Sequence, residues 1–234
     1  MNDNLLQILR ETDTPTICNA IEEAQGKRGF SNFTRKSMHI SELDDKSIVG
    51  YALTAKIIAS IPPKDSPEIV KKRRMDYYKY VSLGENPSVI VIEDEDGDNP
   101  CGAFWGEVNA TIHKALGLKG VITNGTMRDL DVLPKGFPIL SGAIGPSHSF
   151  VHVTDFDCVV NILGMNVNTG DLIHADRHGA CVIPNDILNT LEYSISKLMS
   201  DENIVLEPAR KKGFNYEILE KAWSEIEKSR SKKK

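Results

Sequence analysis

The feature that most constrains the fold is an alternation of short apolar runs with helix-like segments in the middle of the chain. PSVIVIED (87–94) and GVITNG (120–125) are strand-like, and GEVNATIHKALG (106–117) between them is helix-like. Short apolar runs bounded by turn signals are typical of buried strands. The β-branched run IVGYALTAKIIAS (48–60) predicts another strand. This mixture predicts an α/β fold with one sheet-rich core.

Helical patterns flank this core. Residues 4–25 favour two helices, the second opened by Thr14 and Pro15. Residues 186–200 and 214–230 predict two more, the last with an apolar stripe of Phe214, Ile218, Leu219, Trp223 and Ile226. With no repeat and no obvious linker, we expect a core over residues 1–185 and a C-terminal helical extension over residues 186–234.

Shorter elements complete the prediction. Helices are expected in KKRRMDYYKY (71–80) and RDLDVLPK (128–135), and strands in FPIL, VVNILGMNV and ACVIP. KKRR (71–74) is expected to be a solvated helix face.

Composition excludes several classes of protein. The formal net charge of −5 argues against a general affinity for nucleic acid, which depends on neutralising phosphates. The N-terminus lacks the features of a signal peptide, and no apolar stretch approaches the about 18 residues of a membrane span. The four cysteines are far apart and predict reduced, mostly buried thiols. We therefore expect a soluble, cytoplasmic protein with no membrane partner.

Two further clusters are rich in acidic residues and histidines. The run of Asp94, Asp96 and Asp98 begins like a calcium loop but lacks the glycine and the final glutamate, so we expect a solvated turn. In HADRH, alternation places His174, Asp176 and His178 on one face of an extended segment. That arrangement is equally compatible with a structural role and with metal binding. Phosphate-binding and dinucleotide-binding loops, HExxH and GxSxG are absent.

The segment with the clearest chemistry is GEVNATIHKALGLKGVITNGTMRDLDVL (106–133). Gly106 and Glu107 open a predicted helix whose unpaired amides can bind a small carboxylate. Twenty residues separate Glu107 from Arg128, which Asp129 follows directly, and we expect Gly125 to form a tight turn that presents both residues beside the helix start. An arginine offers an anion fork and an aspartate a hard oxygen ligand for Mg²⁺. The alternative is that both residues simply cap a short surface helix.

A resemblance to a known family favours the chemical role of these residues. TPTICNAIEEAQG, IVGYALTA, GEVNA, GLKGVITNGTMRD and GDLIHADRHGACVIP resemble the RraA-like family, over roughly residues 14–185. This family includes divalent-metal 4-hydroxy-4-methyl-2-oxoglutarate/4-carboxy-4-hydroxy-2-oxoadipate aldolases and regulators of ribonuclease E activity. Glu107 replaces the usual aspartate, and Val108–Asn109 replaces two leucines, so Asn109 is expected to alter the substrate pocket.

The resemblance implies a compact swivelling β/β/α-type core and assembly as homotrimers or hexamers. It implies that Asp129 binds Mg²⁺ or Mn²⁺, that Arg128 holds a 2-oxo acid and stabilises the enolate, and that Glu107 relays the proton. Backbone amides of Gly106, Glu107, Val108 and Asn109 would bind the substrate carboxylate.

The implied function is a metal-dependent aldolase, a lyase that cleaves a 4-hydroxy-2-oxo acid and releases pyruvate through a metal-stabilised enolate. Oxaloacetate decarboxylation is the expected side activity because it passes through the same enolate. The alternative is a non-catalytic RraA-like protein that regulates a ribonuclease by direct binding, which co-purification with a large RNA-processing partner would reveal.

Overall fold

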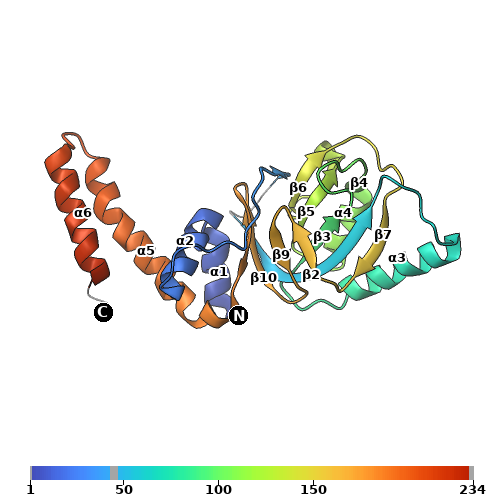
Figure 1. The fold of residues 1–234 in the computed structure, drawn as a ribbon, viewed down its shortest axis with the longest axis horizontal. Coiled ribbons are helices and arrows are strands. Elements are labelled where there is room, and N and C mark those ends of the chain that lie inside the picture. The colour runs from blue at the N-terminus through green and yellow to red at the C-terminus, as the bar shows by residue number, and fades with distance from the viewer. Residues whose placement is uncertain (1, 43–46, 232–234) are drawn as a thin grey trace.

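A computed structural model describes residues 2–42 and 47–231 of the chain. These residues form one large sheet with helices on it and a helical arm at one end (Figure 1). The helices are α1 (Asp3–Glu11), α2 (Thr14–Gln25), α3 (Pro67–Val81), α4 (Glu107–Ala115), α5 (Leu188–Ala209) and α6 (Tyr216–Ser231), with the short 3₁₀ helices η1 (Leu130–Val132) and η2 (Asn185–Ile187). The mixed α/β fold predicted from the sequence is confirmed.

Nine of the described strands share this sheet, in the order β1-β6-β5-β3-β2-β10-β11, with β4 beside β5 and β7 beside β2. They are β1 (His39–Ile40), β2 (Ile48–Ile58), β3 (Ser88–Asp94), β4 (Ala103–Trp105), β5 (Val121–Met127), β6 (Ile139–Ile144), β7 (His152–Phe156), β10 (Leu172–Asp176) and β11 (Gly179–Ile183). Strands β2, β3, β5 and β6 run parallel to one another, and β4 is parallel to β5. The carboxyl ends of these strands therefore meet at one edge, the edge where α/β sheets bind ligands.

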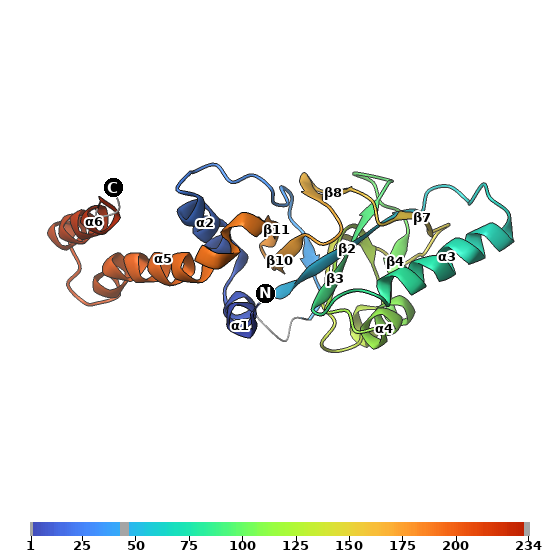
Figure 2. The same cartoon turned by 90° about the horizontal axis from the view of Figure 1, so that it is seen from below.

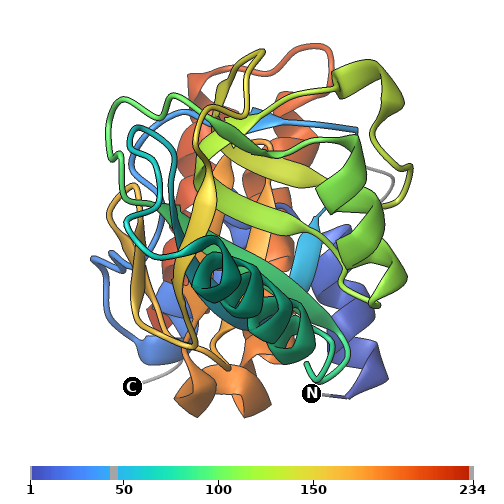
Figure 3. The ribbon, with the colours of Figure 1, turned by 90° about the vertical axis from the view of Figure 1, so that its right-hand side faces the viewer.

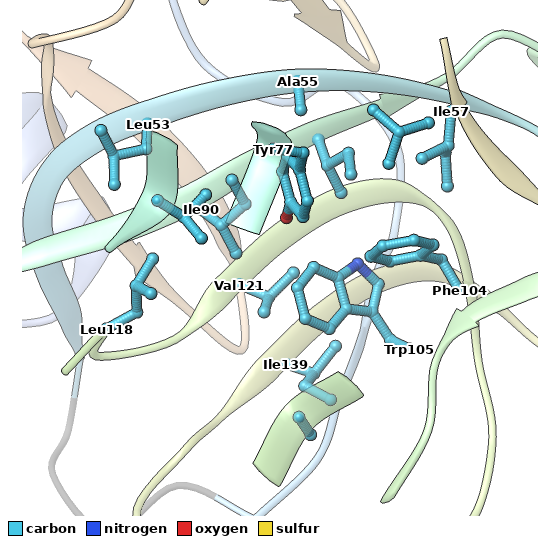
Figure 4. Close-up of a cluster of buried hydrophobic side chains, with 14 of the residues drawn as sticks. Leu53, Ala55, Ile57, Tyr77, Ile90, Phe104, Trp105, Leu118, Val121 and Ile139 are labelled. Carbon is cyan, nitrogen blue, oxygen red and sulfur yellow. The ribbon is translucent and has the colours of Figure 1, made fainter. Parts of the chain in front are cut away.

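The sheet is curled (Figure 3). Each of its faces has its own apolar core. On one face α3 and α4 cover a cluster that contains Tyr77, Trp105 and Val121 (Figure 4). The opposite face is covered by the hairpin of β8 (Val160–Ile162) and β9 (Met165–Val167) (Figure 2). The central strands β2 and β3 are largely buried on both faces, which explains why their sequences are mostly apolar.

A third apolar cluster joins α1, α2 and the start of α5 to β10 and β11. Beyond it, α5 and α6 project from the body as a two-helix arm (Figure 1). α5 continues to Ala209, well past the predicted end at residue 200. The predicted stripe on α6 is largely exposed: Ile226 is buried, whereas Trp223 is 55% exposed. Among the described elements α6 packs mainly against α5, so one narrow side is enough to hold it.

Other expectations are also resolved. Of the free cysteines only Cys181 is buried and Cys101 is exposed, so the prediction of mostly buried thiols is wrong. KKRR lies on α3 as predicted, with ion pairs from Lys72 to Asp76 and from Arg73 to Asp65. None of the helices in the described ranges is long and apolar enough to cross a membrane. The division into a core and an extension at residue 185 stays a prediction.

Candidate functional site

The start of α4 and the end of β5 lie side by side because β4 pairs with β5. The parallel ladder joins Trp105 to Met127, and the Arg128 amide donates to the Trp105 carbonyl at 2.8 Å. Gly106 follows Trp105 directly and is the N-cap residue of α4, without a side-chain cap. The chain therefore brings Gly106 next to Arg128, as the sequence predicted.

Asp129 turns back over the first residues of α4. Its backbone is in the left-handed region (φ 60°), a conformation that aspartate tolerates better than most residues. Its Oδ2 accepts a hydrogen bond from the Glu107 amide at 3.1 Å. A methyl group at Gly106 would lie 2.5 Å from this oxygen, so only glycine allows the approach. The carboxylate thus lies at the positive end of the helix, where a negative charge is stabilised.

The guanidinium of Arg128 lies beside this carboxylate with hydrogen-bonding capacity to spare. Its Nε is 3.6 Å from Asp129 Oδ2, too far for a hydrogen bond. This nitrogen is buried and has no hydrogen-bond partner in the described part of the chain, although the side chain as a whole is 34% exposed. A buried donor without a partner costs free energy unless a ligand satisfies it. Arg128 is therefore prepared to bind an anion.

Asn109 supports the site but does not face it with its side chain. Its Nδ2 donates to the Phe104 carbonyl at 2.6 Å, and its Oδ1 accepts from the Tyr78 hydroxyl at 2.8 Å. Both ends of the amide are therefore occupied by protein. We expected Asn109 to alter the substrate pocket. In the structure its side chain instead joins α3 to β4 through the first turn of α4.

A second link from α3 lies deeper. The Tyr77 hydroxyl is 2.7 Å from His113 Nε2, and His113 Nδ1 is 2.6 Å from the Asn109 carbonyl. Because a carbonyl only accepts, Nδ1 carries the proton and Nε2 accepts from Tyr77. Burial lowers the pKa of His113 to about 4, so its ring is neutral near pH 7. Tyr77 and His113 therefore form a buried, uncharged pair that joins α3 to α4. The sequence analysis did not identify this pair.

One expectation at this edge is wrong, and a second holds only in part. Gly125 is not in a turn: it lies inside β5, where a Cβ would be 2.9 Å from Asp94 Oδ2, and Asp129 makes the turn instead. The acidic run does form a turn over residues 95–98, with Glu95 and Asp98 exposed, but Asp94 ends β3 and is 1% exposed, and its Oδ2 has no hydrogen-bond partner among the described residues. Burial raises the pKa of Asp94 to about 6. Asn124 holds both backbone groups of Asp94, at 2.7 and 2.8 Å. The position of Asp94 at the end of an apolar run was a signal of burial that the sequence analysis missed.

The residues of HADRH lie away from the Arg128–Asp129 pair, and His174 and Asp176 are hydrogen-bonded within the protein. β10 ends at Asp176, so the segment is not extended through His178, but all three side chains gather near the start of α2. His174 is fully buried; its Nε2 lies 2.9 Å from the Leu9 carbonyl and its Nδ1 3.0 Å from the Thr14 hydroxyl. Asp176 accepts from the Thr14 amide at 2.9 Å. These contacts give the cluster a structural role, joining β10 to the turn between α1 and α2.

The residues near Asp129 fit a hydrated divalent cation. Among the described residues no group of three or more histidine, cysteine, aspartate or glutamate side chains could enclose a metal ion. Asp129 uses Oδ2 internally, and its Oδ1 has no hydrogen-bond partner in the described ranges. Mg²⁺ is commonly held by one or two carboxylates, with water and substrate filling its other positions. One free carboxylate oxygen suits that type of site and not a closed protein cage.

Known proteins resemble this chain in sequence and in fold. A family model described as "RraA-like: Aldolase/RraA" matches residues 14–182. DlpA of Legionella pneumophila is 27% identical over 241 residues, which cover 97% of this chain and only 36% of DlpA. A protein of Halalkalibacterium halodurans is 25% identical over 213 residues, 90% of this chain and 85% of its own. It carries the provisional name 4-hydroxy-4-methyl-2-oxoglutarate aldolase.

A solved structure shares the fold. The crystal structure of Streptomyces coelicolor RraAS2, described as an unusual member of the RNase ES inhibitor RraA protein family, has a TM-score of 0.65 and 19% identity. The match covers 90% of this chain and 98% of that one. It confirms the type of α/β core that the resemblance implied.

Proposed function

Because the chain belongs to the RraA-like family, we propose that it is a divalent-metal-dependent lyase that cleaves a 4-hydroxy-2-oxo acid and releases pyruvate. The family contains metal-dependent aldolases as well as non-catalytic ribonuclease regulators. The observation that carries the enzyme proposal is the pairing at the start of α4. Asp129 approaches the Glu107 amide at 3.1 Å, and beside it Arg128 has a buried nitrogen without a hydrogen-bond partner. A protein that acts only by surface binding has no need of this arrangement.

The substrate carboxylate has two kinds of donor available. The guanidinium of Arg128 offers several N–H groups, and the amides of Val108 and Asn109 lie in the first turn of α4, where helical amides lack intrahelical partners. Gly106 removes the side chain that would cover this turn. We propose that these groups hold the 2-oxo acid, with its carbonyl carbon directed toward Asp129.

Carbon–carbon cleavage then needs a base and a place for negative charge. The C4 hydroxyl loses its proton, C4 becomes a carbonyl, and the C3–C4 bonding pair passes into the enolate of pyruvate, which takes a proton at C3. In our proposal Glu107, an exposed carboxylate on the first residue of α4, relays the proton. Arg128 stabilises the enolate oxygen, because a preorganised cation favours charge that develops in the transition state.

A divalent cation on Asp129 would supply Lewis-acid polarisation of the 2-oxo acid. Aldolases of this family depend on such a metal, and we propose Mg²⁺ or Mn²⁺ here. RraA-family proteins form oligomers, and we propose a homotrimer or hexamer.

The test is pyruvate release by the purified chain from a panel of 4-hydroxy-2-oxo acids and from oxaloacetate, with Mg²⁺ or Mn²⁺. Activity should stop with EDTA and return with added metal. Arg128→Lys should lower kcat/KM by about 100-fold, because an ammonium cannot reproduce the planar fork of the guanidinium. Lys119→Arg, a surface cation exchange outside the site, is the control. A chain that releases no pyruvate from any acid would favour the regulatory alternative.

A further inference from the structure

Two cysteines that are far apart in the sequence meet between α2 and the sheet. The thiol of Cys18 on α2 and the thiol of Cys181 on β11 are hydrogen-bonded to each other. Cys181 belongs to the apolar cluster that joins α2 to β10 and β11, and Cys18 packs against that cluster. Cys181 is fully buried, whereas Cys18 is partly exposed. The two thiols therefore form a pair within one chain, and one of them is open to solvent.

The backbone gives an independent reason for this pairing. Cys181 lies opposite His174 in the antiparallel ladder of β10 and β11, so both side chains are on the same face of the sheet. Thr14 and Cys18 are four residues apart on α2 and share one face of that helix. The Thr14 hydroxyl is 3.0 Å from His174 Nδ1. With Thr14 over β10, Cys18 lies one turn further along α2, over the neighbouring strand β11.

The two thiols differ in reactivity. Cys18 accepts the hydrogen bond from Cys181, and this bond lowers the pKa of Cys18 despite its partial burial and the nearby carboxylates of Asp176 and Glu22. Donation of the same bond, together with complete burial, raises the pKa of Cys181. The thiolate is the nucleophilic form of cysteine. Cys18 is therefore the thiol that attacks an external oxidant, and Cys181 is placed to react with Cys18.

We propose that Cys18 and Cys181 form a reversible disulfide and that the oxidant is a peroxide. The Cys18 thiolate attacks one oxygen of hydrogen peroxide, the O–O bond breaks, and Cys18 becomes a sulfenic acid while hydroxide leaves. Cys181 then attacks the Cys18 sulfur, the S–O bond breaks, and the oxygen leaves as water with the thiol proton. The two thiols lose two electrons, and the peroxide gains them to become two water molecules.

This disulfide would fix α2 to the sheet. It would close a loop that runs through most of the chain, from α2 to β11. A cross-link over a long loop stabilises the folded protein mainly by restricting the unfolded chain. We expect the thermal midpoint of the oxidised chain to lie roughly 5 °C above that of the reduced chain.

The experiment treats the reduced full chain with hydrogen peroxide under native conditions and maps disulfide-linked peptides by mass spectrometry. We expect one linked pair, which joins the peptide of Cys18 to the peptide of Cys181 and which dithiothreitol separates. Cys101→Ala removes the exposed thiol and is the control, because it should leave this link intact. Thermal unfolding of the oxidised and reduced chains measures the rise in the midpoint.

Two variants test the order of the steps. In Cys181→Ala the Cys18 sulfenic acid has no thiol partner, so dimedone should label Cys18 at least about tenfold more than in the unmodified chain at equal peroxide. Cys18→Ala changes a partly exposed position and disturbs the core less. It should leave Cys181 unreactive toward peroxide and abolish the rise in the midpoint.

Each readout can contradict a part of the proposal. Links through Cys101 or Cys158, or no link to Cys181, would overturn the disulfide site. Dimedone labelling of Cys18 that is the same with and without Cys181 would overturn the order of the two steps. An unchanged midpoint after oxidation would overturn the expected effect on α2. None of these measurements depends on pyruvate release, so they test this inference separately from the proposed function.

Discussion

Two polar clusters stand out in the sequence, and the structure treats them in opposite ways. Around His174 and Asp176 the groups are buried, and each of these side chains is hydrogen-bonded to the start of α2 or the turn before it. Around Arg128 and Asp129 the groups are partly exposed, one residue has a left-handed backbone, and a buried nitrogen lacks a partner. A cluster that satisfies itself stabilises a fold, whereas unused hydrogen-bonding capacity at an open edge is available to a ligand.

The largest expected effect comes from Asp129. Asp129→Asn keeps an oxygen for the Glu107 amide and tolerates the left-handed backbone, but removes the negative charge that a cation needs. We expect metal-dependent turnover to fall at least about 1,000-fold, or about 4 kcal/mol, with a thermal midpoint close to that of the unmodified chain. Steady-state assays and thermal unfolding, both at saturating Mg²⁺, measure this. Full activity would contradict the site assignment.

Disrupting the buried cluster of His174 and Asp176 should have the opposite effect, a loss of stability with unchanged activity. Asp176→Ala leaves the Thr14 and His178 amides without their acceptor in a buried place, and we expect a loss of about 3 kcal/mol in the free energy of unfolding. The activity of the remaining folded protein should be unchanged. Urea unfolding and active-site titration measure the two quantities, with the exposed Asp186→Ala as control. A selective loss of activity at full stability would place this cluster in the functional site.

Asp94 combines the two behaviours, since it is buried but has an unused oxygen. Its folded pKa of about 6 lies above the ordinary 3.8, so ionised Asp94 opposes folding. This penalty is fully present above about pH 6 and disappears as the pH falls below 3.8. Asp94→Asn should therefore raise the free energy of unfolding at pH 8 by at most about 3 kcal/mol.

The same variant should bring no gain at pH 3.5. Urea titrations at the two pH values measure the difference, and Asp98→Asn, whose side chain is 77% exposed, is the control. An equal change at both pH values would show that ionisation of Asp94 is not the cause.

The smallest expected effect comes from Tyr78, whose hydroxyl is hydrogen-bonded to Asn109 in the first turn of α4. Tyr78→Phe removes the hydroxyl that donates to Asn109 Oδ1 and should destabilise the chain by about 1 kcal/mol. If the first turn of α4 binds the substrate carboxylate, KM should rise a few-fold while kcat changes little. Tyr216→Phe, an exposed residue on the arm, is the control. A fall in kcat with an unchanged KM would indicate a role in the chemical step.

Much of the local structure could be predicted from the sequence. The apolar runs became β2 and β3, the capped segments near the N-terminus became α1 and α2, and the six predicted site residues lie together between 106 and 129. The elements follow from periodicity and cap residues, which act within one element, whereas the set of site residues was implied by the resemblance to the RraA-like family. Their catalytic and binding roles stay predictions until activity is measured.

What only the tertiary structure decided depends on neighbours distant in sequence. Gly125 signals a turn by itself, yet it lies in a strand because Asp94 packs against it. Asp94 is charged and flanked by acidic residues, yet β3 and β5 bury it. The stripe on α6 has the pattern of a core face, yet within the described ranges α5 is its main neighbour and leaves most of the stripe exposed. Local preferences are set by the residue itself, but burial and hydrogen-bond satisfaction are set by what packs against it.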